Sequence, residues 1–133
     1  MSEKLTVVLV DDSKSVLERL QNLIAEIDGV DVVGTAADGA GAIQTVSETR
    51  PDLVVMDIVM PAMDGLAALR LLRVNHPSVR VVMVSSVGGT LSRAEEAFRL
   101  GAVQVLGKPT DAAQLEALFA GERERKAGGR VSS

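Results

Sequence analysis

Short apolar runs alternate with longer amphipathic segments along the chain. The runs lie at residues 5–10 (LTVVLV), 30–36, 53–56 (LVVM), 80–84 and 103–106, and most of them are apolar nearly throughout and rich in Val. Continuous apolar runs of this length are typical of strands that are buried on both faces of a sheet. The pattern therefore predicts five buried β-strands.

The segments between these runs carry apolar residues at helical spacing. In residues 13–27 the apolar positions include Val16, Leu20, Leu23 and Ile27, which fall on one face of a helix. Further helices are predicted at residues 40–48, 64–74, 91–100 and 112–120, because Gly and Pro residues interrupt the chain between them.

Five strands that alternate with five helices predict an α/β fold with a parallel sheet covered on both faces. Right-handed crossovers leave few arrangements of such a sheet. We expect a single domain with the flavodoxin-like (βα)5 doubly wound fold and the strand order 2-1-3-4-5. This domain should span residues 1–120. The tail at 121–133 is charged and then Gly-rich, so its first part can extend the last helix and the rest is expected to be flexible.

Composition narrows the possible chemistry. The 133 residues include no Cys and a single His, His76, so thiolate and His-cluster metal sites are excluded and a metal would need oxygen ligands. The net charge is -4 and no basic stripe is present, which argues against direct nucleic-acid binding. No signal peptide or membrane-spanning stretch is recognisable, so we expect no membrane association and a cytoplasmic location.

Chemically active side chains follow four of the five predicted strands. Asp11 and Asp12 end the first, Asp57 the third, Ser85 the fourth and Lys108 the fifth. In a doubly wound sheet the carboxyl ends of the strands share one rim, and ligands bind there at the switch in strand order. We therefore expect these side chains to converge.

Three carboxylates in one pocket repel each other and favour a hard divalent cation. Mg²⁺ binds one or two carboxylates, waters and phosphate oxygens. Asp57 follows the central strand, which makes it the candidate nucleophile for a phosphoryl group. Lys108 would supply a positive charge and Ser85 a hydroxyl donor. Each residue also has a structural interpretation, such as helix capping by Asp11 and Asp12 or a surface position for Lys108. Their shared rim favours the chemical interpretation.

The motifs VVLVDDSKSV, LVVMDIVMPAMDG, VVMVSS and GAVQVLGKP, in this order, resemble those of the response-regulator receiver family over residues 5–120. The likeness is strongest to the receiver of the chemotaxis methylesterase and to the stand-alone chemotaxis regulator. The resemblance implies a two-component phosphoacceptor that binds Mg²⁺ and catalyses only its own phosphorylation and dephosphorylation. It implies a sensor histidine kinase or phosphotransfer protein as donor, and a downstream protein or fused output domain as target.

The resemblance also assigns roles to single residues. Asp57 matches the phosphoacceptor and a metal ligand, with Ser85 and Lys108 as its hydroxyl and lysine partners. The remaining matched metal positions are Asp12 as a direct ligand, the backbone carbonyl of Val59, and Asp11 as an indirect ligand. Pro109 matches a proline that is usually preceded by a cis peptide bond.

Two features depart from the usual receiver or modify it. Val105 stands three residues before Lys108, where the family usually has Tyr or Phe. An aromatic swing during signalling is therefore impossible in this chain. Val59 and Val87 occupy the two positions that flank the path of water to the phosphate. Neither can orient a water molecule, which predicts slow loss of the phosphoryl group.

Three other functions remain as alternatives. The first is a receiver-shaped interaction module that is not phosphorylated. The second is a flavodoxin-like redox protein, which is disfavoured because Asp11 and Asp12 would repel the flavin phosphate and no Trp or Tyr is present to stack a flavin. The third is an aspartate-dependent phosphatase, which usually places its nucleophile after the first strand and a second Asp two residues later. It is disfavoured because Asp11 and Asp12 are adjacent.

Overall fold

The computed structural model describes residues 4–86 and 91–131. Strands and helices alternate strictly along the chain. The strands are β1 (Leu5–Val10), β2 (Val30–Ala36), β3 (Leu53–Asp57), β4 (Arg80–Ser85) and β5 (Gln104–Gly107). The helices are α1 (Lys14–Ala25), α2 (Gly39–Thr49), α3 (Gly65–Asn75), α4 (Leu91–Arg99) and α5 (Ala112–Val131).

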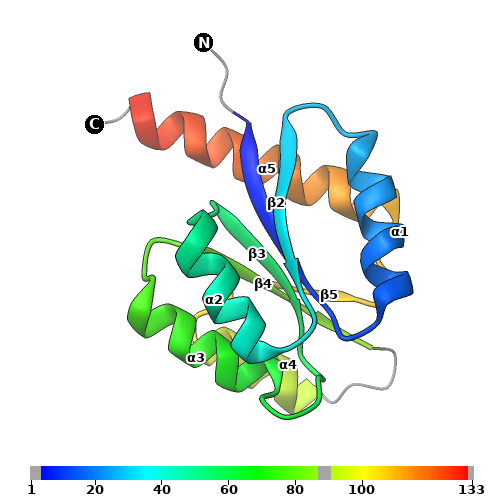
Figure 1. Cartoon of the computed structure of the whole chain (residues 1–133). Coiled ribbons are helices and arrows are strands. Elements are labelled where there is room, and N and C mark those ends of the chain that lie inside the picture. The colour runs from blue at the N-terminus through cyan, green and yellow to red at the C-terminus, as the bar shows by residue number, and fades with distance from the viewer. Residues whose placement is uncertain (1–3, 87–90, 132–133) are drawn as a thin grey trace.

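The strands form one parallel sheet in the order β2-β1-β3-β4-β5. This order confirms the predicted flavodoxin-like arrangement. Helices α1 and α5 cover one face of the sheet, and α2, α3 and α4 cover the other (Figure 1). The strand order reverses between β1 and β3, so a crevice opens beyond the carboxyl ends of these two strands.

The core consists of one apolar layer on each face of the sheet. Successive residues of a strand point to opposite faces. Val54 and Met56 of β3 therefore pack toward α2, α3 and α4, whereas Val55 packs toward α1 and α5. Both layers are mainly aliphatic, with Phe119 fully buried under α5. Burial on both faces explains why the strands are nearly continuous apolar runs.

Polar residues fix the starts of three helices. Ser13, Asp38 and Asp64 are the N-caps of α1, α2 and α3, and each side chain accepts a hydrogen bond from a backbone N–H three residues on. Such caps stabilise a protein by about 1 kcal/mol each. The cap of α1 is therefore Ser13, while Asp11 and Asp12 remain available for other contacts.

Helix α5 extends well beyond its predicted end at residue 120 and reaches Val131. The helix thus includes the first part of the tail, as the sequence allowed, and residues 132–133 lie outside the described residues. Ion pairs hold the extension: Glu122 binds Arg80 and Lys126 binds Asp52, each at 2.7 Å. The other predicted boundaries agree with the structure to within two residues. Among the described residues no helix, α5 included, has the length and apolar character needed to cross a membrane.

Candidate functional site

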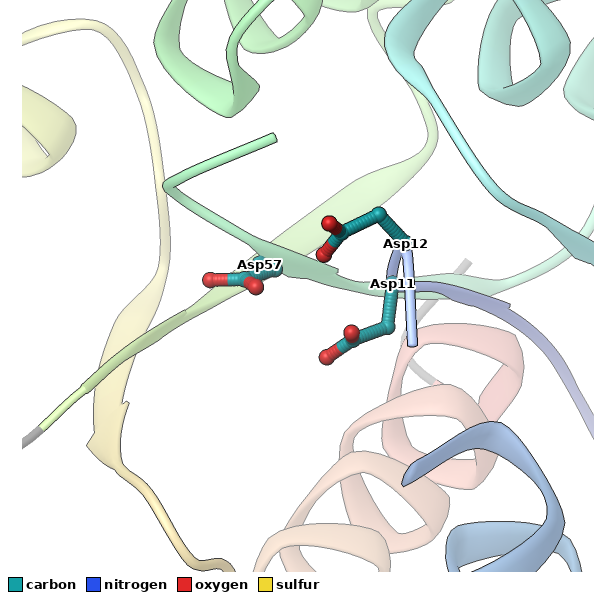
Figure 2. Close-up of side chains that lie close together, drawn as sticks. All are labelled: Asp11, Asp12 and Asp57. Carbon is teal, nitrogen blue, oxygen red and sulfur yellow. The ribbon is translucent and has the colours of Figure 1, made fainter. Parts of the chain in front are cut away.

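Three carboxylates meet at the crevice between β1 and β3. Asp57 is the last residue of β3, and Asp11 and Asp12 directly follow β1. One carboxylate oxygen from each lies within 4.8 Å of the others. Their side chains project to the same side of the strand ends (Figure 2). The structure thus brings together the three acidic residues that the sequence places at these ends.

The three residues differ in their exposure to solvent. Asp11 and Asp57 are only 3% and 6% exposed, whereas Asp12 is an exposed residue. Asp57 follows Val55 by two positions, so its side chain lies on the sheet face covered by α1 and α5. Burial of charged carboxylates is unfavourable unless they are paired. Asp11 and Asp57 therefore need a cationic partner.

Lys108 provides that partner. It follows β5, and its Nζ lies 2.6 Å from Oδ2 of Asp11 and 2.9 Å from Oδ2 of Asp57. Its peptide bond to Pro109 is cis. The lysine therefore bridges the two buried carboxylates and leaves Asp12 outside the pair.

The charges around Lys108 act on its pKa. Burial alone would lower the pKa of its ammonium group. Hydrogen bonds from Lys108 to Asp11 and Asp57, together with their negative charges, outweigh burial and raise the pKa of Lys108 above its ordinary value. Lys108 is therefore a fixed positive charge at neutral pH, which suits it to bind an anion.

Backbone N–H groups orient both buried carboxylates. The N–H of Ser13 donates to Oδ1 of Asp11 at 2.9 Å, and the N–H of Val59 donates to Oδ1 of Asp57 at 3.2 Å. Each carboxylate thus has one oxygen bonded to the backbone and the other bonded to Lys108. This arrangement fixes the position of Asp57 before any ligand arrives.

The oxygen atoms at this rim fit a hard divalent cation. Asp12 makes no hydrogen bond or ion pair with the described residues, so its carboxylate is free to bind a metal. The backbone carbonyl of Val59 likewise accepts no hydrogen bond from them. Two to three carboxylates and one carbonyl, with room for water, make a donor set suited to Mg²⁺.

The hydroxyl of Ser85 lies on the same rim but does not contact the carboxylates. Ser85 ends β4, and its Oγ donates to the carbonyl of Ser86 over a long 3.5 Å. Such a weak contact leaves the hydroxyl free to turn toward another acceptor. Val87, to which the sequence assigned a role in shielding the phosphate, lies outside the described residues.

Gly65 supports the site in a way that sequence reasoning missed. It is the first residue of α3, and its N–H donates to the carbonyl of Ile58 at 2.7 Å. A Cβ at this position would overlap the carbonyl oxygen of Asp57 and approach the Cα of Ile58 to 2.8 Å. Glycine allows the start of α3 to pack directly on the main chain of Asp57. The Asp64-Gly65 pair was the available signal, but in the sequence it indicates only the start of a helix.

An apolar cavity of about 380 Å³ adjoins the acidic cluster. Val16 and Leu20 of α1 line it on one side, and Pro109 and Thr110 of the β5–α5 connection line it on another. Asp57, together with Asp11 and Lys108, also borders this cavity. The two buried carboxylates therefore border an apolar cavity between α1 and the β5–α5 connection.

The comparison with protein families agrees with this geometry. Residues 7–120 match the model of the response regulator receiver domain. The chain belongs to this family. The match confirms the resemblance that the sequence motifs carry, and it covers nearly the whole sheet and its helices.

Individual relatives of this receiver are larger proteins that are named as methylesterases. It is 41% identical over 104 residues to protein-glutamate methylesterase/protein-glutamine glutaminase 5 of Myxococcus xanthus, covering 78% of this chain and 30% of the relative. It is 45% identical over 108 residues to protein-glutamate methylesterase/protein-glutamine glutaminase 4 of Geobacter metallireducens. This match covers 77% of this chain and 30% of the relative. The receiver therefore spans about a third of the length of these relatives.

A solved structure shows the same fold. The CheX-CheY-BeF3-Mg+2 complex from Borrelia burgdorferi superimposes with a TM-score of 0.79 at 30% identity, covering 85% of this receiver and 84% of that chain.

Val105 of β5 differs from the aromatic residue usual in receivers. It pairs with Met83 of β4 and packs, half-buried, against the apolar layer under α2, α3 and α4. Its stiff, short side chain has no second rotamer that could reach the site. No aromatic ring is therefore present at this position of the receiver.

Proposed function

We propose that this receiver takes a phosphoryl group onto Asp57 in the presence of Mg²⁺ and thereby switches a partner-binding surface. The observation that supports this function best is the position of Asp57. Its carboxylate is fixed by the N–H of Val59 and by Lys108, and it faces two further carboxylates at an open rim. Phosphoryl transfer depends mainly on such positioning and charge stabilisation.

The transfer needs few groups from the protein. A carboxylate oxygen of Asp57 attacks phosphorus, and the bond from phosphorus to the donor breaks with its electron pair leaving on the donor. Lys108 then binds a phosphoryl oxygen, for which its ammonium group already lies beside Asp57. Ser85 donates its hydroxyl to a second phosphoryl oxygen. Asp12, Asp57 and the carbonyl of Val59, with Asp11 indirectly, would hold Mg²⁺, which would supply positive charge against the negative charge of the transferring group.

The donor is a phosphohistidine of a sensor histidine kinase or of a phosphotransfer protein, which approaches between α1 and the β5–α5 connection. The target is a downstream protein or a fused output domain in the cytoplasm. The methylesterase relatives support a role in chemosensory signalling, because this receiver matches 30% of the length of each of them. The receiver itself would act on no other substrate.

Incubation with acetyl phosphate and Mg²⁺, followed by intact-protein mass spectrometry, tests this function. We expect the parent protein to gain the mass of one phosphoryl group. Asp57→Asn should gain none, because an amide cannot serve as the nucleophile. Asp31→Asn, which changes an exposed residue of β2, is the matched control and should behave as the parent. Removal of Mg²⁺ with EDTA should suppress the modification.

Phosphorylation of Asp57→Asn at the rate of the parent would disprove the assignment of the nucleophile. An unmodified parent in the presence of Mg²⁺ would favour the second candidate, an interaction module that keeps the receiver fold. The observation that favours this candidate is Val105, which removes the usual aromatic from β5.

A further inference from the structure

A second cleft lies at the amino-terminal ends of the strands, opposite the end of the sheet that carries Asp57. It has a volume of about 540 Å³, within the range of ligand-binding clefts. Charged residues from three segments line it: Arg50 and Asp52 between α2 and β3, Arg80 at the start of β4, and Glu122, Arg125 and Lys126 on α5. The cleft is thus separated from the acidic site by the length of the strands.

The charge of this cleft is opposite to that of the whole protein. Its lining has four basic side chains and two carboxylates, which gives a net charge of +2 with His76 neutral. The whole chain has a net charge of -4. A local positive potential on an acidic protein attracts small anions to this position.

Pairing within the cleft leaves two guanidinium groups free. Arg80 binds both carboxylate oxygens of Glu122 at 2.7 and 3.2 Å. Lys126 binds Asp52 at 2.7 Å. The side chains of Arg50 and Arg125 make no hydrogen bond or ion pair with the described residues. Both carboxylates are therefore neutralised, and the excess positive charge belongs to these two arginines.

The backbone holds Arg50 at the cleft in one conformation. Arg50 is the C-cap of α2 and has left-handed dihedral angles, with φ 47° and ψ 63°. The following Pro51 disfavours the right-handed helical region for the residue before it. Arg50 therefore lines the cleft from the C-terminal end of α2.

Helix α5 forms the other wall of the cleft. Its residues Glu122, Arg125 and Lys126 lie beyond residue 120, where the match to the receiver family ends. Arg123 adds a hydrogen bond from its Nη1 to the carbonyl of Asp28 at 3.2 Å, which helps to hold this part of the helix against the domain. This wall of the cleft therefore lies outside the residues that match the receiver family model.

We propose that this cleft binds a small ligand with at least two phosphate charges, such as a polyphosphate or a nucleotide. The planar guanidinium groups of Arg50 and Arg125 would each bind two phosphate oxygens through paired N–H donors. Two separate guanidinium groups on one open cleft match a ligand with two or more adjacent charged phosphates.

Isothermal titration calorimetry with sodium pyrophosphate tests this site. Titrations are made at low ionic strength and in EDTA, which keeps divalent cations from the acidic site. We expect saturable binding of one pyrophosphate per chain that weakens with added salt. Arg50→Asn, whose side chain tolerates the left-handed conformation, and Arg125→Gln should each weaken binding by about tenfold. Arg99→Gln, at an exposed position of α4, is the matched control and should bind as the parent.

Further titrations identify the ligand class. A nucleoside triphosphate that binds more tightly than pyrophosphate would indicate a nucleotide, and equal affinities would indicate a polyphosphate. The proposal is wrong if pyrophosphate does not saturate the parent, if Arg99→Gln weakens binding as much as the cleft variants, or if the dicarboxylate malonate binds as tightly as pyrophosphate. Because Arg50 and Arg125 are tested separately, misfolding of one variant leaves the other as a test. The result does not depend on phosphorylation of Asp57.

Discussion

The Nζ of Lys108 lies 2.6 Å from Oδ2 of Asp11, nearer than to Asp57 at 2.9 Å. The lysine thus partly neutralises the acidic cluster before any metal binds. It also competes for the carboxylate oxygens that Mg²⁺ would use. Stability without metal and affinity for metal should therefore respond in opposite directions to the loss of this lysine.

Lys108→Met tests this competition. Without metal, the variant leaves Asp11 and Asp57 without their cation, so its free energy of unfolding should fall by about 2 kcal/mol. Its affinity for Mg²⁺ should rise, because a positive charge beside the site has been removed. Thermal unfolding across a Mg²⁺ titration measures both effects. Lys14→Met, at an exposed position at the start of α1, is the control. If Lys108→Met has the same metal-free stability as the parent, the ion pairs contribute little.

Asp12→Ala tests the metal site itself. Mg²⁺ at about 100 times its Kd should stabilise the parent by about 2.7 kcal/mol, which corresponds to a rise in Tm of roughly 10 °C. Asp12→Ala should lose most of this rise, because the one free carboxylate of the cluster is gone. Its metal-free Tm should equal or exceed that of the parent, since repulsion is relieved. A metal-free Tm well below the parent would mean that Asp12 is structural. Asp31→Ala is the control.

Gly65→Ala tests the close packing of α3 on the main chain of Asp57. The added Cβ would overlap the Asp57 carbonyl oxygen, so either the helix or the site must shift. We expect a loss of stability of about 2 kcal/mol and slower phosphorylation by acetyl phosphate. Gly121→Ala on α5 is the matched control. A Cβ there meets nothing within 4 Å, so stability should rise by about 0.5 kcal/mol. Equal behaviour of the two variants would contradict the packing argument.

Val59→Asn tests the lifetime of the phosphoryl group. Val59 is 61% exposed and follows Asp57 by two positions. An apolar side chain there cannot orient an attacking water, whereas Asn can. Such help typically increases a rate by about 100-fold or more. We expect phosphate release to accelerate in Val59→Asn and to stay unchanged in Val74→Asn on α3. If the parent loses phosphate as fast as Val59→Asn, this residue does not control hydrolysis.

Asp52 should make stability depend on pH. Burial tends to raise the pKa of its carboxyl group, but hydrogen bonds from Lys126 and from the N–H and hydroxyl of Thr6 lower it below its ordinary value. The folded-state pKa is thus below the unfolded one. Its stabilisation is present above the ordinary Asp pKa of about 3.9 and is lost as pH falls through the lower folded-state pKa.

Urea unfolding at a series of pH values from about 6 downward measures this effect, in the parent and in Asp52→Asn. The difference in stability between the two proteins should shrink below about pH 4. A difference that stays constant with pH would show that the carboxylate charge of Asp52 does not stabilise the fold. Asp31→Asn, which changes an exposed carboxylate on β2, is the control and should not alter the pH profile.

The sequence predicted the order of the elements and the strand order of the sheet. Both follow from local patterns, because strands buried on two faces must be continuously apolar and helices on a sheet must be amphipathic. The same logic placed Asp11, Asp12, Asp57, Ser85 and Lys108 on one rim, since parallel strands end at the same edge. These predictions needed no distances.

The length of α5 could not be predicted in this way. Its second half has a mixed-charge, Gly-containing sequence that is typical of a flexible tail. The helix persists because Glu122 and Lys126 meet Arg80 and Asp52, which are about 40 or more residues away in the chain. Contacts between distant segments leave no local pattern.

By itself the sequence therefore determined which chemistry the rim of the sheet carries, because residue type and position at a strand end are local properties. Only the tertiary structure decided how these groups are paired. It set Lys108 between Asp11 and Asp57, left Asp12 free, and required glycine at position 65 against the Asp57 carbonyl. Pairing and close approach depend on distances between separate elements, and such distances exist only once the two apolar layers have packed the helices against the sheet.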